Sequence, residues 1–332
     1  MLAVDKPPAA HPYARLTPDA VLDALAAAGF SPDGRLLALG SYENRVYQVW
    51  LDDAEGRDSV VVAKFYRPGR WSDAQIDEEH AFARELAERE IPVVAPLCSL
   101  RFREFRVAVY PRRGGRTPEL GDERTLEWLG RFIGRIHAVG ATRSFRHREA
   151  LTPQSFGHEP RRFLLEGGFV PAELAEPWQA ATEQALAAVE RCYERAGAVR
   201  AIRLHGDCHP GNILWTDQGP HFVDLDDARM GPAMQDLWML LSGERAAMAR
   251  QLGRVLAGYG EFAELDRREL HLVEALRTLR LIHYSAWIAR RWDDPAFPAA
   301  FPWFGTARYW QDRILELREQ IALMQEEPLS PA

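Results

Sequence analysis

The sequence predicts an α+β fold with two lobes, a small antiparallel-sheet lobe followed by a large, mainly helical lobe. Three observations predict it: strand-like stretches dominate the first 110 residues, helical periodicity dominates from about residue 122, and a linker near residues 111–118 separates them. A chain of 332 residues also exceeds the usual size of one domain. We therefore expect a first lobe over residues 1–110, a hinge over 111–118 and a second lobe over 119–332.

Composition narrows the class of protein. With 47% hydrophobic and 27% charged residues, the chain is neither disordered nor fibrous. The formal net charge of -7 offers no general attraction to nucleic acid or to an anionic membrane. No apolar run approaches the length of a membrane span, and the first residues lack the apolar core of a signal peptide. Three distant cysteines make no disulfide framework, so we expect a cytoplasmic protein without membrane insertion.

The first lobe begins with a helix and continues as strands. Thr17 is a helix N-cap followed by proline, and the helix ends at Gly29. Residues 52–56 resemble a hairpin loop, and the capping-box spacing Ser72-Asp73-Ala74-Gln75 opens a second helix that ends before Pro92. The predicted strands cover residues 36–39, 45–51, 59–65 and 105–110.

The second lobe reads as a set of long helices that encloses one β-rich segment. The segment spans residues 201–225 and is rich in Gly, His, Asp and Asn. Apolar residues flank each of its polar clusters, so short strands would deliver the polar groups onto loops at one end. The predicted helices cover residues 122–139, 171–196, 245–258, 267–292 and 306–324.

The β-rich segment carries a phosphotransferase pattern. Asp207 precedes Asn212 by five residues, and Asp224 follows twelve residues later, which is the spacing of a kinase catalytic loop and its metal-binding Asp. Carboxylate and amide oxygens suit Mg²⁺, so Asn212 and Asp224 are the expected metal ligands. Asp207 and Asp224 are the expected catalytic residues. Asp207 would accept a hydrogen bond from the attacking hydroxyl and take its proton.

A second group of candidate ATP-site residues lies in the first lobe. Lys64 ends the apolar strand Val61-Val62-Ala63 and is a candidate ligand of the α- and β-phosphates of ATP. Glu79 lies fifteen residues further, on the helix that Ser72 caps, where it would pair with Lys64 and orient it. The neighbouring Glu78 is the alternative partner.

These segments resemble the aminoglycoside phosphotransferase and choline kinase superfamily, and within it a family of bacterial stress-response Ser/Thr protein kinases. The resemblance extends from Thr17 to about Pro328. It implies a protein-kinase-like fold, ATP as co-substrate, Mg²⁺ as cofactor, transfer to Ser/Thr hydroxyls of proteins in a stress response, and an ATP-site role for Ser41. The segments that carry it are His205–Asn212, Phe222–Asp224, Ser41–Tyr47, Lys64–Pro68, Asp224–Arg229 and Gln235–Leu240.

The sequence departs from eukaryotic protein kinases at three points. Gly40 is the single glycine where a glycine-rich loop would cover the phosphates, although a turn there can still aim backbone N–H groups and the Ser41 hydroxyl at phosphate. Gly206 replaces the arginine that would hold an activation-loop phosphate, and no Ala-Pro-Glu follows Asp224. We therefore expect no control by activation-loop phosphorylation.

The sequence leaves open the acceptor, a possible metal site, the role of an aromatic cluster and the oligomeric state. The variant His-Gly-Asp loop also suits a small-molecule kinase for an amino alcohol, sugar or aminoglycoside, and a non-catalytic scaffold is a third reading. The alternating His205, Asp207 and His209 could ligate a metal in a hydrolase. Nine aromatic residues between positions 281 and 310 form either a helical core or part of the acceptor cleft. No heptad seam is evident, so a monomer is expected.

Overall fold

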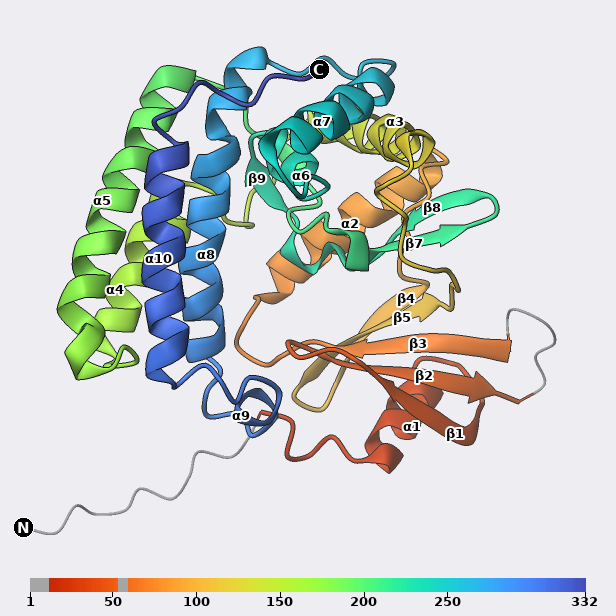
Figure 1. Cartoon of the computed structure of the whole chain (residues 1–332). Coiled ribbons are helices and arrows are strands. Elements are labelled where there is room, and N and C mark those ends of the chain that lie inside the picture. Colours follow the sequence, from red (N-terminus) through yellow and green to blue (C-terminus); the bar gives the residue numbers. More distant parts are fainter. Residues whose placement is uncertain (1–11, 53–58) are drawn as a thin grey trace, which may run out of the picture. The chain divides into compact units, whose positions relative to one another are not determined.

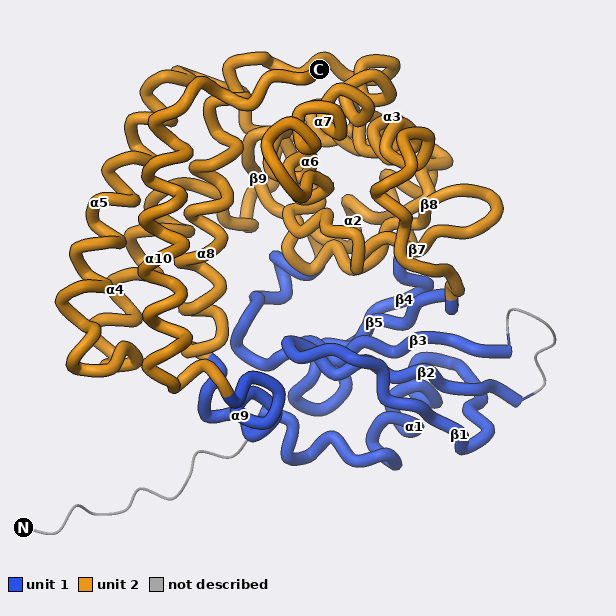
Figure 2. The backbone as a smooth tube through the Cα atoms, in the orientation of Figure 1, with its two compact units in different colours: residues 1–76, 95–112, 291–302 blue, residues 77–94, 113–290, 303–332 orange. Residues whose placement is uncertain are grey.

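The structure, a computed structural model, describes residues 12–52 and 59–332 (Figure 1). The chain divides into two compact units: residues 1–76, 95–112 and 291–302 form unit 1, and residues 77–94, 113–290 and 303–332 form unit 2 (Figure 2). This partition differs from the predicted lobes, because residues 77–94 group with the second unit and residues 291–302 with the first. Most of the predicted hairpin loop 52–56 lies outside the described residues.

Unit 1 contains a five-stranded antiparallel sheet in the order β1-β2-β3-β5-β4. The four predicted strands are present, each within a few residues of its expected bounds. The short edge strand β4 was not predicted; it forms a hairpin with β5 through a turn in which Arg103 has a φ of 53°. The strands are β1 (Pro32–Leu39), β2 (Arg45–Leu51), β3 (Val60–Phe65), β4 (Cys98–Phe102) and β5 (Phe105–Pro111).

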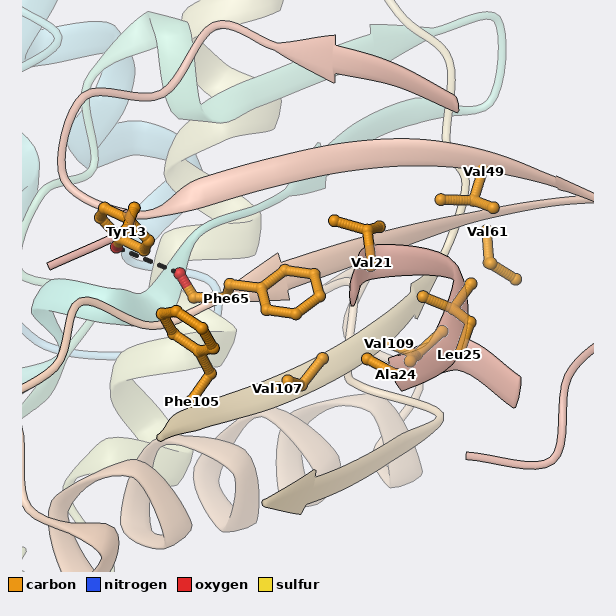
Figure 3. Close-up of a cluster of buried hydrophobic side chains, with 11 residues drawn as sticks. Tyr13, Val21, Ala24, Leu25, Val49, Val61, Phe65, Phe105, Val107 and Val109 are labelled. Carbon is orange, nitrogen blue, oxygen red and sulfur yellow. Dashed lines mark hydrogen bonds between the residues drawn. The ribbon is translucent and has the colours of Figure 1, made fainter. Parts of the chain in front are cut away.

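Helix α1 (Pro18–Ala27) covers one face of this sheet and closes the core of unit 1 (Figure 3). Its predicted cap is confirmed, since the Thr17 hydroxyl accepts a hydrogen bond from the Ala20 N–H at 3.2 Å. Side chains alternate along β3, so Lys64 lies on the face opposite this core. The buried cluster comprises Tyr13, Val21, Ala24, Leu25, Val49, Val61, Ala63, Phe65, Phe105, Val107 and Val109.

Helix α2 (Asp73–Glu88) begins with the predicted capping box. The Gln75 N–H donates to the Ser72 hydroxyl at 3.3 Å, and the Ser72 N–H donates back to the Gln75 side-chain oxygen at 2.9 Å. Ile76 packs with Tyr66 and Ala108 in unit 1, whereas the helix from Asp77 onward groups with unit 2.

The helices of unit 2 confirm four of the predicted helices and correct the fifth. The predicted helix over 267–292 is a 3₁₀ turn followed by a shorter α-helix, and α4, its preceding π-turn at Gln154–His158 and α6 were not predicted. The helices are α3 (Glu123–Gly140), α4 (Glu159–Glu166), α5 (Ala172–Ala196), α6 (Met234–Trp238), α7 (Arg245–Tyr259), α8 (Val273–Ala289) and α10 (Ala307–Leu323).

Two packing arrangements organise these helices (Figure 1). Helices α3 and α7 approach at glycines, and a Cβ added to Gly130 would lie 2.0 Å from the Val255 carbonyl oxygen. Helices α4, α5, α8 and α10 form a bundle in which the buried rings of Trp178 and Trp310 meet edge to face at 5.6 Å. Large aromatic side chains bury much apolar area, so this pair stabilises the bundle.

The predicted β-rich segment forms two small antiparallel sheets in unit 2. One pairs β6 (Ile202–Leu204) with β9 (Arg229–Gly231), and the other pairs β7 (Ile213–Thr216) with β8 (Gly219–Phe222). The predicted α+β class is therefore confirmed. Over the described part of the chain, no helix is both long and apolar enough to cross a membrane.

Candidate active site

The β7–β8 hairpin places Asn212 and Asp224 beside each other. Ile213 pairs with Phe222 at the open end of the hairpin, and the Val223 N–H donates to the Asn212 carbonyl at 3.0 Å. Asn212 precedes the first strand and Asp224 follows the second, so both leave the sheet at the same end. Asp224 has left-handed backbone angles (φ 60°, ψ 65°), which Asp tolerates better than most residues and which turn the chain away from the strand.

Asp236 on α6 holds the loop that carries Asp207 through hydrogen bonds to its backbone. This fully buried carboxylate accepts the N–H groups of His205 and Gly206, each at 2.9 Å, and contacts His137 Nε2 at 3.0 Å. Gly206 has a φ of 87°, and a Cβ there would lie 2.1 Å from the Asp227 carbonyl oxygen. Glycine is therefore required where the Asp207 loop crosses the segment after Asp224.

Three side chains surround the Asp207 carboxylate. Asn212 Nδ2 donates to the Asp207 carbonyl at 3.0 Å and lies 3.4 Å from Oδ2, which is also 3.4 Å from His209 Nε2. Arg280 of α8 lies 2.6 Å from Oδ1. Burial alone would raise the pKa of Asp207, but the hydrogen bond from His209 and the charge of Arg280 outweigh it and hold that pKa well below its ordinary value.

This environment keeps Asp207 ionised and makes it a weak base. Such a carboxylate can orient a hydroxyl group without removing its proton early. In phosphoryl transfer through a loose transition state, orientation of the attacking oxygen matters more than base strength. The catalytic role of Asp207 stays a prediction, and this environment is the geometry on which it depends.

The donor set at the end of the hairpin fits a hard divalent cation. Because Asn212 Nδ2 donates to the Asp207 carbonyl, the amide oxygen faces the other way. The amide oxygen of Asn212 and the carboxylate of the exposed Asp224 are the oxygen ligands that Mg²⁺ prefers. Both emerge from the same end of the hairpin.

The arrangement does not fit the hydrolase alternative. His205 Nε2 lies 2.9 Å from the Val223 carbonyl oxygen, so this ring braces the two loops. Within residues 12–52 and 59–332, no three His, Cys, Asp or Glu side chains gather as a metal site. Cys208 is fully buried, and burial raises the pKa of its thiol well above the ordinary value, which makes it a poor nucleophile.

Ser41 lies in unit 1, in a turn that buried charges hold in place. Glu43 and Asn44, two and three positions after Ser41, are both buried. Glu43 pairs with Arg67 at 3.0 Å and with Arg291 at 2.5 Å, and the Asn44 side chain accepts the Arg67 N–H at 3.1 Å. These contacts join the segment Ser41–Tyr47 to the segment Lys64–Pro68.

Arg67 has a second acidic partner that the sequence did not indicate. Its guanidinium lies 2.6 Å from Asp294, which also pairs with Arg45 at 3.2 Å. Asp294 stands more than 220 positions along the chain, so no local pattern could connect it with Arg67.

Lys64 is buried in the sheet of unit 1. It pairs across the strands with Val46 and Ala108, and its ammonium lies 4.7 Å from the centre of the Tyr66 ring. Ser41 and Lys64 belong to unit 1, whereas Glu79 and the Asp207 loop belong to unit 2. The expected pairing of Lys64 with Glu79 therefore stays a prediction.

Within unit 2, Glu78 and Glu79 point in different directions from α2. The Glu78 carboxylate accepts the backbone N–H groups of residues 146, 147 and 148 at 2.6–3.0 Å. Burial opposes ionisation of Glu78, but these three hydrogen bonds lower its pKa. Glu79 is buried and pairs with Arg148 at 3.0 Å.

Arg148 joins Glu79 to the segment that follows Asp224. Its Nη1 donates to the carbonyls of Asp226 at 2.7 Å and Ala228 at 2.9 Å. This side chain is completely buried, and nothing in the local sequence marks it. Arg148 and Arg280 are thus site residues that sequence analysis missed.

The aromatic residues of positions 281–310 are mainly core. Phe297 and Phe301 are buried in unit 1, and Phe304, Tyr309 and Trp310 are buried in unit 2. The partly exposed rings of Tyr284 and Trp287, on α8, stack at 5.7 Å.

Comparisons with known proteins agree with this geometry. Residues 33–272 match the model of the phosphotransferase enzyme family. The chain is 44% identical over 325 residues to stress response kinase A of Escherichia coli and to the serine/threonine protein kinase RdoA of Salmonella typhimurium, covering 96% of this chain and 97% of each relative.

Solved structures share the fold at low sequence identity. Amicoumacin kinase hAmiN, in complex with AMP-PNP, Ca²⁺ and Ami, aligns with a TM-score of 0.70 at 17% identity, covering 94% of this chain and 95% of that one. A choline/ethanolamine kinase family protein from Mesorhizobium loti aligns with a TM-score of 0.61 at 18% identity, covering 92% and 98%. The expected kinase-like fold is confirmed.

Proposed function

The chain belongs to the phosphotransferase enzyme family, and from this premise we propose that it transfers the γ-phosphoryl group of ATP, with Mg²⁺, to Ser and Thr hydroxyls of proteins. The relatives are named stress response kinase A and serine/threonine protein kinase RdoA, and these names support a stress-response Ser/Thr kinase. The observation that carries the proposal is the Asp207 carboxylate, held between Asn212 and Arg280 above a buried Asp236 anchor. A cytoplasmic monomer remains our expectation.

The proposed mechanism assigns roles to residues of each unit. Asp207 orients the acceptor hydroxyl and receives its proton as the bond from the acceptor oxygen to the γ-phosphorus forms and the bond from that phosphorus to ADP breaks, which releases ADP. Asn212 and Asp224 would hold Mg²⁺, which neutralises charge on the phosphate oxygens when bound. Lys64 would bind the α- and β-phosphates, and the Ser41 turn would contact phosphate through its N–H groups and hydroxyl.

The proposal assigns Glu79 as the partner of Lys64. The contacts of the two glutamates support this choice, because the Glu78 carboxylate already accepts three backbone N–H groups. Glu79 is the buried residue of the two, and its pairing with Arg148 ties it to the segment after Asp224.

A phosphorylation assay tests the proposal. The full chain is incubated with radiolabelled ATP and Mg²⁺, with casein in one series and with a panel of small alcohols, sugars and aminoglycosides in another. We expect label on protein, and we expect Asp207→Asn to abolish it while ATP still raises the melting temperature. Asp217→Asn is the matched control, because Asp217 is an exposed residue at the turn of the same hairpin.

Each other outcome contradicts part of the proposal. Label on small alcohols alone would identify a small-molecule kinase. No label in either series, with no effect of ATP on melting, would indicate a non-catalytic scaffold. Near-normal turnover in Lys64→Ala or Asp224→Ala would contradict the assigned roles of those residues.

A further inference from the structure

Arg280 lies at the reacting carboxylate, at the surface of unit 2. Its Nη1 is 2.6 Å from Asp207 Oδ1, and its side chain is 39% exposed, against 22% for Asp207. The contact is therefore accessible to a molecule that approaches Asp207 from solvent.

Helical spacing sets Arg280 on one partly exposed face of α8. Arg277, Arg280, Tyr284 and Trp287 recur at intervals of three and four residues, whereas most of the residues between them are buried. The stacked rings of Tyr284 and Trp287 continue this face beyond the arginine. A ligand that lies along α8 would thus meet positive charge beside Asp207 and flat apolar surface further on.

The charge of Arg280 is paired with Asp207, and α8 itself adds no second acidic side chain at the surface. The single carboxylate of the helix, Glu274, is buried and pairs with Arg277 at 3.3 Å. On the other side of Asp207 stands His209, whose side chain is 40% exposed. Arg280 contacts Asp207 through Nη1, so the other N–H donors of the guanidinium can contact an anionic group that lies beside Asp207.

We propose, on the basis of the kinase function above, that Arg280 selects acceptors in which a carboxylate lies close to the phosphorylated hydroxyl, that is, acidic Ser/Thr peptides. A guanidinium has five N–H donors in a planar fork, so it can contact Asp207 and a substrate carboxylate together. Successive Cα atoms are about 3.8 Å apart, so the acidic residue should stand within about two positions of the Ser or Thr. Arg280 then positions the hydroxyl against Asp207.

The test compares three peptides that share one central Ser and differ only in flanking residues, which are Glu, Gln or Lys. For the full-length enzyme we expect kcat/KM to be at least about tenfold higher for the acidic peptide than for the basic one. Arg280→Gln should reduce this ratio to within about twofold, mainly through the KM of the acidic peptide, and Arg280→Glu should reverse it. Arg280→Lys should retain part of the preference, because it keeps the charge but loses the fork.

The ratio between peptides separates specificity from damage. Removal of Arg280 also changes the environment of Asp207, but that effect acts on all three peptides alike and cancels in the ratio. Arg290→Gln is the matched control: this exposed arginine stands about 15 Å further along the helix and packs over Phe163, so the preference should persist.

Two results would overturn the inference. One is a wild-type enzyme that phosphorylates the acidic and basic peptides equally well. The other is an acidic preference that survives in both Arg280→Gln and Arg280→Glu. Failure of the underlying kinase function would look different, since no protein or peptide would then be labelled in the wild type.

Discussion

Arg148 provides the sharpest test of what holds unit 2 together around the site. Its buried guanidinium pairs with the buried Glu79 at 3.0 Å and donates to two backbone carbonyls, those of Asp226 and Ala228. Arg148→Ala removes one partner of a buried ion pair, a change that costs about 3–5 kcal/mol in other proteins. The two carbonyls also lose a donor, although water that enters the new space can replace part of that interaction.

We therefore expect Arg148→Ala to lower the free energy of unfolding by about 4 kcal/mol. Urea unfolding at pH 7, monitored by circular dichroism, measures the loss of unfolding free energy, and thermal unfolding by calorimetry provides a second measurement. Arg143→Ala is the control, because Arg143 lies in the same loop and pairs with Glu85 at 2.6 Å but is 59% exposed. An exposed pair of this kind contributes about 0–1 kcal/mol.

A double-mutant cycle with Glu79→Gln isolates the ion pair from the carbonyl contacts. The coupling energy between positions 148 and 79 should exceed about 1 kcal/mol, because contacting charged groups are not additive. If Arg148→Ala costs no more than Arg143→Ala, or if the two positions show no coupling, burial does not strengthen this pair and the reasoning is refuted.

Three further changes have defined outcomes. Gly206→Ala should lower the melting temperature and the turnover together, because its Cβ would lie 2.1 Å from the Asp227 carbonyl oxygen at a φ of 87°. Asp236→Asn should reduce kcat far more than nucleotide affinity, measured by the ATP-dependent melting shift, since the amide cannot accept from the His205 N–H and His137 as the carboxylate does. Burial raises the pKa of Glu269 from 4.5 to about 7, so the folded state binds more protons than the unfolded state between these pH values. The free energy of unfolding, measured with urea, should therefore fall by up to about 3 kcal/mol from pH 5 to pH 8. The fall should be smaller in Glu269→Gln.

Local sequence signals predicted much of the fold because they act over a few residues. The cap at Thr17 and the capping box at Ser72 involve neighbours three positions away, and both are present. Strand alternation located β2 at its observed bounds, Arg45–Leu51. The break between the 3₁₀ turn at Arg267–Leu272 and α8 was missed, since apolar periodicity continues across it.

The site could be predicted only where the motif spacing itself carries the geometry. Asp207 and Asn212 stand five residues apart, so one loop brings them together. Arg148 and Arg280 reach Glu79 and Asp207 across 69 and 73 positions, and no periodic pattern encodes such pairs. The choice between adjacent residues of α2 is equally invisible, because residues one apart on a helix differ by about 100° in direction and only the packing of the folded chain distinguishes them.

The contacts around Asp224 bear on how this enzyme would be controlled. In kinases that use activation-loop phosphorylation, an added phosphate orders the segment after the metal-binding Asp by pairing with arginine. Here arginines already order that segment: Arg148 donates to the carbonyls of Asp226 and Ala228, and Arg229 pairs with Asp227 at 2.6 Å. The absence of such control stays a prediction, and the contacts of Arg148 with this segment are the same ones that make Arg148→Ala costly.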